Sequence, residues 1–548
     1  MPRSNRLVLA HLWVTFGTLA IAAVLGAWPM WVRSPLHAPY SNPESYFESV
    51  TAHGTTMAYV MPTFFVMGFG YYVAETALER TLPGRAWAWA GFALGVAGGA
   101  MALGTVFSGR ASVLYTFYPP LTAYPLYYLG IVLVVVASWI WCVLMIVAMA
   151  QWKRINPGQA VPLVHFGTVA NAIMWLWTTV GVAVEVLVLV IPAAVGWTDT
   201  VDVGLTRTLF SWTLHAIVYF WLFPAYIAFY TMAPRAAGGR LYSDLMGRIS
   251  FVLLAIYSVP VGIHHLFMDP EQATGFKYLQ AFLSGLVTVP TLLTVFTITA
   301  SFEVAGRLRG GTGRLGWLRA IPWDRPMVLA TGLAFVMLWF GGGGGLINMS
   351  YGMNAMVHNT SWVTAHFHLI FGGTAVIMYF AIAYHIWPRL TGRAAPSVAW
   401  QRGQLWLWFV GMMVTTLPWH WLGLNGQWRR VAHFDYADPL LAWWAPWVVV
   451  SFLGGLVLLA SALLLVWNLA GFHLETPAPA QQAGFAAGPE RYALSLHPVG
   501  RVPAALNGFA TWNVVLLVLM VVSYGWPVAQ FLVTPSPGAV VHRLFGAG

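Results

Sequence analysis

The sequence predicts an all-α, polytopic membrane protein with about thirteen transmembrane helices. Hydrophobic residues make up 59% of the 548 residues, charged residues only 8%, and the mean hydropathy is +0.71. A soluble chain of this length would expose far more charge on several separate domains. Apolar stretches long enough to cross a bilayer recur along the chain instead. We therefore expect a single transmembrane domain over residues 1–548.

Each expected span is a stretch of about 20 or more mostly apolar residues. The stretches lie at roughly 7–32, 51–75, 86–107, 125–150, 166–191, 206–233, 248–268, 277–303, 326–348, 361–387, 403–424, 440–470 and 508–532. The Pro-, Ala- and Gly-rich segment 471–507 predicts a flexible cytoplasmic loop without a domain of its own.

Loop charge predicts the orientation of these spans. With the N-terminus in the cytoplasm, nineteen of the 26 Lys and Arg residues fall in inner segments and seven in outer segments. Short cytoplasmic loops are enriched in Lys and Arg, so the N-terminus is expected inside and the C-terminus outside. The net charge of +10 is then a topology signal. It indicates contact with a lipid bilayer and gives no reason to expect a nucleic-acid partner.

Six histidines fall within expected spans, although the bilayer interior disfavours polar groups. Alternating topology places all six within about ten residues, or roughly 15 Å, of the outer surface. They are His53, His215, His264, His265, His366 and His368. One such histidine would more often be a hydrogen-bonded core residue. Six in one layer predict a functional site, because intramembrane polar groups are costly and usually functional.

The spacing of these histidines divides them by chemistry. His264 and His265 are adjacent, and Pro260 before them can loosen the helix. Together with His215 they could supply three nitrogen ligands to one metal ion, which suits copper, iron or zinc. His366 and His368 point about 200° apart on a regular helix, so they serve different partners. His53 and His368 could be the two axial ligands of one haem, and His366 the single axial ligand of a second.

These motifs resemble the catalytic subunit of the haem–copper oxygen reductases. "HFHL" lies on one span, "HH" on another and His-x-x-x-Tyr, from His215 to Tyr219, on a third. Thirteen spans and the runs "HAIVYFWLFPAY", "TASFEVAGRLRGG" and "HNTSWVTAHFHL" are similar to the B family, the ba-type cytochrome c oxidases. The resemblance implies the subunit I fold of that superfamily. It also implies reduction of dioxygen to water with electrons from cytochrome c, coupled to proton translocation, in the inner membrane of a prokaryote.

The same resemblance implies a set of cofactors and ligands. A low-spin haem, haem b, is expected on His53 and His368, and an a-type high-spin haem on His366. One copper ion is expected on His215, His264 and His265. The resemblance further implies that Tyr219 is covalently joined to His215 and supplies an electron and a proton when the dioxygen bond breaks.

A row of hydroxyl groups predicts a proton path. Tyr226 and Tyr230 lie seven and eleven residues after Tyr219, so they share its helix face within about 20° and reach roughly 16 Å further inward. Thr291 and Thr294, at i and i+3 on the eighth span, could continue the row. Tyrosines also pack between helices without moving protons. Similarity to the family's K-type channel favours the relay.

Electrons must enter from outside this chain. The single cysteine, Cys142, excludes a thiolate-bridged dinuclear copper centre here, so a subunit II carrying that centre and a cytochrome c donor are implied. Arg429 and Arg430 follow the eleventh span on the outer side. Their guanidiniums suit haem propionates, and His358 and Asn359 could join them.

Three residues depart from the family pattern or have no role in it. Ala216 replaces the proline that usually follows the first copper ligand, which puts the local bend of the sixth span in question. Asn354 replaces an aspartate near the high-spin haem propionates, which questions any pumping scheme that relies on that acid. Glu185, within the fifth span, is either a neutral hydrogen-bonded group or a proton site.

Two other functions compete with this reading. Nitric oxide reductases of the same superfamily use iron in the non-haem site and carry glutamate where this chain has Tyr219, so the phenol favours dioxygen. A haem-bearing transporter or assembly scaffold is a second class. Transporters usually show paired, interrupted half-repeats, which the sequence lacks, and they have no need of three imidazoles around one metal.

Overall fold

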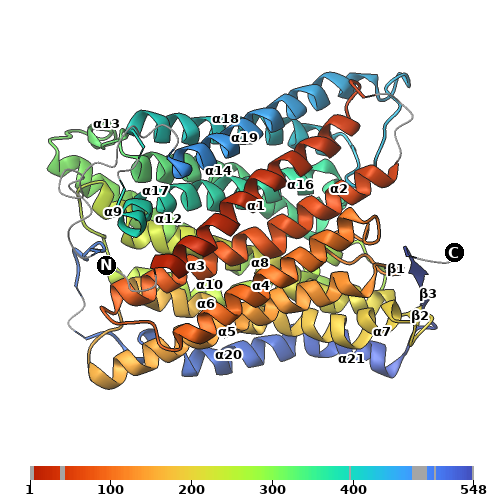
Figure 1. Cartoon of the computed structure of the whole chain (residues 1–548), viewed down its shortest axis with the longest axis horizontal. Coiled ribbons are helices and arrows are strands. Elements are labelled where there is room, and N and C mark those ends of the chain that lie inside the picture. Colours follow the sequence, from red (N-terminus) through yellow and green to blue (C-terminus); the bar gives the residue numbers. More distant parts are fainter. Residues whose placement is uncertain (1–4, 38–42, 394–395, 472–489, 499–500, 546–548) are drawn as a thin grey trace.

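A computed structural model describes residues 5–37, 43–393, 396–471, 490–498 and 501–545. Long helices lie side by side in one bundle, and the two ends of the chain lie at opposite ends of it (Figure 1). A chain that crosses a membrane an odd number of times has its two ends on opposite sides of that membrane. The bundle therefore agrees with the predicted all-α membrane class.

Eleven helices of the described chain are long and apolar enough to cross a membrane. They are α1 (Asn5–Val32), α2–η1–α3 (Pro43–Ala77), α4 (Arg85–Phe107), α5 (Pro125–Ile155), α6–η2–α7 (Leu163–Ala194), α8 (Val203–Thr231), α11–α12 (Thr274–Leu308), α14 (Pro326–Met349), α16–η4–α17 (Ser361–Thr391), η5–α19 (Ala442–Ala470) and α20–η7–α21 (Ala510–Val533).

The other two predicted stretches are helical as well. They form α18 (Val398–Leu424) and the pair α10 (Asp244–Ser258) and η3 (Gly262–Leu266). Shorter helices complete the connections: α9 (Ala233–Ala236), α13 (Gly316–Ala320), α15 (Tyr351–Val357) and η6 (Ala504–Leu506). Every one of the thirteen predicted stretches therefore coincides with helix.

The histidine-bearing spans are the innermost ones. In the most apolar window of each span, 94% of the residues are buried for Pro43–Ala77 and 89% for Ser361–Thr391. The corresponding share is 28% for Ala510–Val533, at the edge of the bundle. Helices apolar all round are buried by neighbouring helices or face lipid. The spans carrying His53, His366 and His368 are buried by neighbouring helices.

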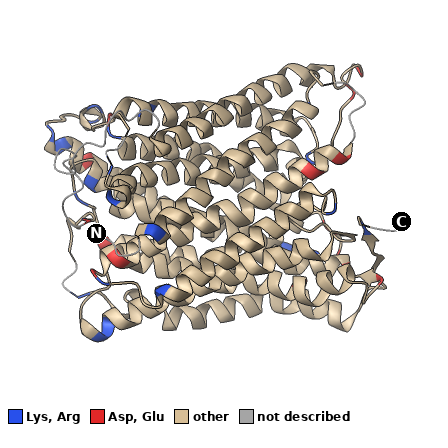
Figure 2. Ribbon diagram, viewed as in Figure 1, with Lys and Arg blue, Asp and Glu red and all other residues tan. Residues whose placement is uncertain are grey.

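Basic side chains are distributed unevenly between the two ends. Figure 2 shows most Lys and Arg at the end that holds the N-terminus and few at the end that holds the C-terminus. This distribution agrees with the loop-charge bias, and the N-inside orientation stays a prediction.

Two small sheets tie the C-terminal residues to loops. Strand β1 (Leu121–Thr122) pairs in parallel with β4 (His542–Arg543), and β2 (Thr200–Val201) pairs antiparallel with β3 (Ala539–Val540). Through these strand pairs the C-terminal residues contact the loop before α5 and the loop before α8. Both loops lie at the end of the bundle that holds the C-terminus (Figure 1).

The predicted cytoplasmic loop, 471–507, is described only in part. Residues 472–489 and 499–500 lie outside the described residues. Of the rest, Glu490 Oε2 accepts a hydrogen bond of 2.6 Å from the Tyr72 hydroxyl, and the Ala493 N–H donates to the Thr231 carbonyl over 2.7 Å. These contacts attach residues 490–498 to the helices, and the flexibility of the remainder stays a prediction.

Four spans contain a π-helical turn. These turns are η1 (Thr56–Val60), η2 (Glu185–Val190), η4 (Leu369–Ala375) and η7 (Val521–Gly525). One begins three residues after His53, one immediately after His368, and one at Glu185. Because π-turns inside α-helices occur frequently at functional sites, their positions draw attention to these three residues.

Candidate haem and metal centre

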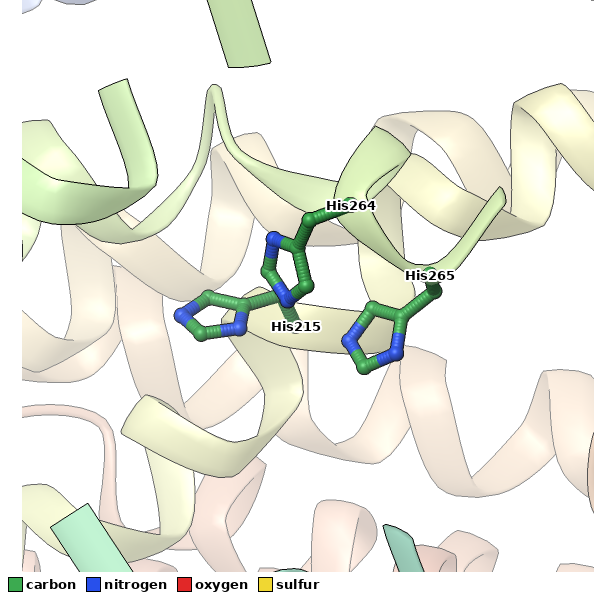
Figure 3. A group of neighbouring side chains, drawn as sticks. All are labelled: His215, His264 and His265. Carbon is green, nitrogen blue, oxygen red and sulfur yellow. The ribbon is translucent and has the colours of Figure 1, made fainter. Parts of the chain in front are cut away.

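Three imidazoles form one cluster. Their candidate ligand nitrogens, on His215, His264 and His265, all lie within 4.8 Å of one another. Figure 3 shows the three rings close together, with His215 supplied by α8 and the other two by η3. The ring centroids of His215 and His264 are 4.7 Å apart, and those of His264 and His265 are 4.2 Å apart. This is a geometry that can hold one metal ion.

The local backbone brings two adjacent histidines to this cluster. Helix α10 ends at Ser258, and His264 and His265 lie on the 3₁₀ turn η3, as the weakening effect of Pro260 predicted. Gly262 allows η3 to approach α8, because a Cβ at this position would overlap the Ser211 carbonyl. The Tyr524 hydroxyl accepts a hydrogen bond of 2.9 Å from the Gly262 N–H.

Two of the three rings have a nitrogen available for coordination. His264 Nδ1 lies 2.9 Å from Ser284 Oγ, which leaves Nε2 available. His215 Nε2 is buried and has no hydrogen-bond partner among the described residues. Buried polar atoms nearly always have a partner, so an unpartnered nitrogen beside two other imidazoles fits a metal ligand. The donor set itself suits copper, and it also suits zinc or iron.

A second pair of histidines fits a haem with two axial ligands. The rings of His53 and His368 are parallel within 6°, and their centroids are 6.3 Å apart. Two metal–nitrogen bonds of roughly 2 Å, with an iron between them, place ring centroids about 6 Å apart. Nδ1 of His53 lies 2.8 Å from the Ala22 carbonyl and Nδ1 of His368 lies 2.8 Å from the Thr364 carbonyl. These bonds leave Nε2 of both rings as the nitrogens that could bind a haem iron.

His366 uses the other side of the same helix. Its Nδ1 lies 2.6 Å from the Gly341 carbonyl on α14, which leaves Nε2 as the nitrogen that could bind a second iron. Gly345 allows this ring to lie directly against α14, since a Cβ there would come within 2.9 Å of His366 Cε1. His368 instead packs against Trp419, with ring centroids 5.2 Å apart. Helix α16 therefore presents the two rings to different neighbours, and their ligation of two separate haems stays a prediction.

One cavity connects all these residues. It has a volume of about 870 Å³ and is lined by all six histidines, Tyr219, Tyr226, Thr291 and both Arg429 and Arg430. Cofactor sites commonly occupy cavities of several hundred Å³ with mostly apolar walls and a few placed polar groups. The six histidines, which span more than 300 residues of sequence, thus surround a single space.

Tyr219 lies beside the three-imidazole cluster. Its ring centroid is 4.9 Å from that of His215, with the rings tilted by 45°. Helix α8 is continuous from Val203 to Thr231, with Pro224 as its internal proline, so Ala216 introduces no break. The position after the first predicted copper ligand is therefore regular helix, and His215 still reaches the cluster.

The predicted hydroxyl row exists as two bonded groups. The Tyr226 hydroxyl lies 3.0 Å from Thr291 Oγ1, and the Tyr230 hydroxyl donates to Thr294 Oγ1 over 3.0 Å. Ser250 Oγ, on α10, lies 2.7 Å from Thr294 Oγ1. No direct hydrogen bond among the described residues joins the two groups or joins Tyr219 to Tyr226. Sequence reasoning did not identify Ser250, because a lone serine on a span carries no periodic signal.

The arginine pair lies at the opposite side of the cavity from this row. Arg429 donates to Asn359 Oδ1 through Nη2 over 2.9 Å, and the Arg430 guanidinium lies over the Tyr118 ring, 5.3 Å from its centroid. Burial and then the charge of Arg430 lower the pKa of Arg429 to about 9. Within the described residues neither guanidinium pairs with a carboxylate. Two partly desolvated cations without an acid fit anionic groups such as propionates.

His358 and Asn354 adjoin the arginine pair. His358 Nδ1 lies 3.2 Å from Asn354 Oδ1, and the Asn354 amide donates to the Asn348 carbonyl over 2.6 Å. Burial, followed by the charges of Arg429 and Arg207, lowers the pKa of His358 to about 4. At neutral pH this histidine is uncharged, so Asn354 and His358 form a neutral hydrogen-bonded pair at the cavity wall.

Comparison with known proteins identifies the family. Residues 6–457 match the family described as cytochrome c and quinol oxidase polypeptide I. The chain belongs to this family. Cytochrome c oxidase subunit 1 of Thermus thermophilus is 36% identical over 508 residues, which cover 90% of this chain and 88% of the relative. Cytochrome c oxidase subunit 1 of Thermostichus vulcanus is 29% identical over 419 residues, covering 72% and 71% of the two chains.

A solved structure extends the match to three dimensions. A haem–copper terminal oxidase dimer determined by cryo-electron microscopy aligns with a TM-score of 0.92 and 29% sequence identity, covering 100% of this chain and 96% of that one. The predicted subunit I fold and the predicted terminal oxidase function are confirmed. Placement within the B family, the role of each ligand and the type of each haem stay predictions.

Proposed function

We propose that this terminal oxidase subunit reduces dioxygen to water in the cavity between α8, η3, α14 and α16, in the plasma membrane of a prokaryote. The observation that carries the proposal is the pairing of two ligand environments in one cavity. Parallel rings of His53 and His368 suit a low-spin haem, and His366 faces the cluster of His215, His264 and His265 across the same space.

Each ligand group has a separate task in this proposal. His53 and His368 hold the low-spin haem, for which the resemblance favours haem b, and His366 holds an a-type high-spin haem. His215, His264 and His265 hold one copper ion. When bound, these groups supply electron transfer and the redox chemistry of dioxygen. Tyr219 holds a transferable proton next to the copper ligands, and the Nδ1 contacts of the histidines keep their rings oriented.

Electrons reach this chain through partners. The one cysteine, Cys142, is buried in α5, so a dinuclear thiolate-bridged copper centre must lie on another chain. We propose a subunit II with that centre, reduced by cytochrome c, docked over the end of the bundle that carries Arg429 and Arg430. The arginines then neutralise haem propionates beneath the entry point.

Metal content and optical spectra test this function. The purified complex is expected to contain two haem irons and one copper per copy of this chain, plus the copper of subunit II. Its reduced spectrum should show two haems, of which carbon monoxide shifts one. The nitric oxide reductase alternative predicts a third, non-haem iron in place of the copper. The position of Tyr219, 4.9 Å from His215, favours the oxidase.

We further propose that protons reach Tyr219 from the N-terminal end of the bundle through the two hydroxyl groups. Tyr230, Thr294 and Ser250 form the inner group, and Tyr226 with Thr291 forms the outer group, which lines the cavity. Water between the groups would complete the relay. Hydroxyls suit this task because each can donate and accept at once.

Replacing Thr294 with valine is expected to slow steady-state turnover by about tenfold, which is less than the hundredfold or more expected for a group that transfers a proton in the reaction itself. Valine keeps the shape and removes the hydroxyl that bonds Tyr230 and Ser250. Haem content and carbon monoxide binding should stay normal, and Thr294→Ser should restore most of the rate. Thr331→Val is the matched control, because this buried threonine on α14 bonds the carbonyl of Met327. Equal rates for Thr294→Val and Thr331→Val would rule out this route.

A further inference from the structure

The buried acid Glu185 has no task in the site described so far. We propose that Glu185 is a proton-binding site of the oxidase, on the side of the three-imidazole cluster opposite the hydroxyl row. The inference rests on the proposed function, because the charge changes that would load and unload this site occur at the neighbouring haem and copper ligands.

The carboxyl group of Glu185 is buried without a polar partner in the described part of the chain. Glu185 is 0% exposed, and neither Oε1 nor Oε2 has a hydrogen-bond partner among the described residues. An unpaired carboxylate in such a position would cost many kcal/mol, whereas a neutral carboxylic acid costs far less. The acid therefore holds its proton while it remains buried. No cation compensates it: the salt bridges of the described chain leave Glu185 out.

Glu185 nevertheless borders the functional cavity. It lines the same space as the six histidines and the arginine pair. It is also the first residue of the π-turn η2, where the regular hydrogen bonding of the span is interrupted. A small rotation of the side chain toward the cavity would place the carboxylate where water and the cavity's charged groups can solvate it. The neutral acid is thus buried beside a polar cavity into which it can release its proton.

The height of Glu185 in the bundle follows from the contact between α6 and α8. The Val182 N–H donates to Thr213 Oγ1 over 3.1 Å, which sets these two residues level. Because the two helices run in opposite directions, Glu185 lies about level with Phe210, five residues from His215. At 1.5 Å per residue this is roughly 8 Å along the helix axis. Tyr226 lies eleven residues from His215 in the other direction, so the metal cluster separates Glu185 from the proton entry.

Polar groups continue beyond Glu185 toward that end of the bundle. Tyr128, within electrostatic range of Glu185, accepts a 3.0 Å bond from the Ala123 N–H and keeps its own O–H to donate. Thr116 Oγ1 is buried without a partner among the described residues, and Thr116 and Arg207 both line the cavity. Buried polar groups of this kind usually bind ordered water. They mark a route from Glu185 to the loop before α5.

The proposed step is a simple proton exchange. Glu185 binds a proton as a neutral acid when negative charge rises in the cavity. When that charge falls, the carboxyl O–H bond breaks, the proton passes to cavity water, and a carboxylate remains until the next proton arrives. No electron moves in this step. A proton taken up on one side of the metal cluster is thereby released on the other side through Glu185.

Infrared difference spectroscopy of the purified complex tests the proposal. The reduced-minus-oxidised spectrum should contain a carbonyl-stretch band of a protonated carboxylic acid. Glu185→Gln should abolish this band, and Glu185→Asp should shift it. In reconstituted vesicles Glu185→Gln should also lower the number of protons released per electron at least twofold, with unchanged haem and copper content.

Glu75→Gln is the matched control. Glu75 is also buried, but its Oε1 accepts a hydrogen bond of 3.1 Å from the Leu82 N–H at the other end of the bundle, so this variant should keep the band. A band that survives in Glu185→Gln, or unchanged proton release in that variant, would overturn the inference. Failure of the proposed function has a different signature, since it would show as missing haems or absent dioxygen consumption in the wild-type complex.

Discussion

Replacing His366 with alanine is expected to remove the carbon-monoxide-binding haem and to leave the spectrum of the low-spin haem in place. The reason is the division of ligands by α16. His366 contacts α14 through the Gly341 carbonyl, whereas His368 faces His53 with parallel rings on the other side. Dioxygen consumption should fall to background, because His366 is the one described histidine on α16 that faces the three-imidazole cluster. Optical spectra with and without carbon monoxide measure this outcome.

The reverse variant is the control. His53→Ala removes one of two axial ligands, so the low-spin haem signal should be lost or converted while the carbon-monoxide-binding haem remains. Both variants need to be compared at equal amounts of correctly inserted protein. Loss of both haems in either variant, with the chain still inserted, would contradict the assignment of the two histidines to separate sites.

Tyr219→Phe is expected to lower turnover by roughly a hundredfold or more, which is typical of losing a group that donates a proton in the reaction. The phenylalanine ring keeps the packing beside His215, 4.9 Å away, and removes the hydroxyl alone. Haem and copper content should therefore stay normal. Dioxygen consumption under saturating electron donor, together with metal analysis, measures the effect.

Two further measurements decide whether a loss of turnover in Tyr219→Phe is due to the Tyr219 hydroxyl. Tyr226→Phe removes a hydroxyl bonded to Thr291 in the same cavity, but this residue lies about three helical turns from His215, so its effect should be smaller. A peptide containing residues of α8 cross-linked between Tyr219 and His215 would be detected by mass spectrometry of the digested protein. Near-normal turnover of Tyr219→Phe would reduce this tyrosine to a packing residue.

The sequence by itself determined the membrane class and the number of helical segments. Hydropathy is a local property, and a backbone in lipid must satisfy its own hydrogen bonds, so each long apolar stretch has to form a helix. Thirteen predicted stretches accordingly coincide with helix, including α18 and α10, which are not among the eleven strongest spans. The two-residue spacing of His366 and His368 likewise predicted two separate partners, because a helix fixes the angle between them.

Only the tertiary structure decided how these ligands are oriented. The parallel rings of His53 and His368, 315 residues apart, result from the packing of α1, α2, α16 and α18, which no local pattern contains. The partners that orient the rings are also distant and unremarkable in sequence: the Ala22 and Gly341 carbonyls and Ser284 Oγ. Backbone carbonyls carry no residue-type signal, so the sequence cannot mark them.

The same reason explains Ser250 and Glu185. The sequence placed both on spans. Ser250 bonds Thr294, whereas Glu185 has no hydrogen-bond partner among the described residues, and this difference depends on which side chains the neighbouring helices place beside them. Burial cost depends on the whole surroundings of a group, because a polar atom is inexpensive when paired and costly when alone. Residue type and spacing therefore determined which groups could act in this protein, and the packing of distant helices determined which of them face one another.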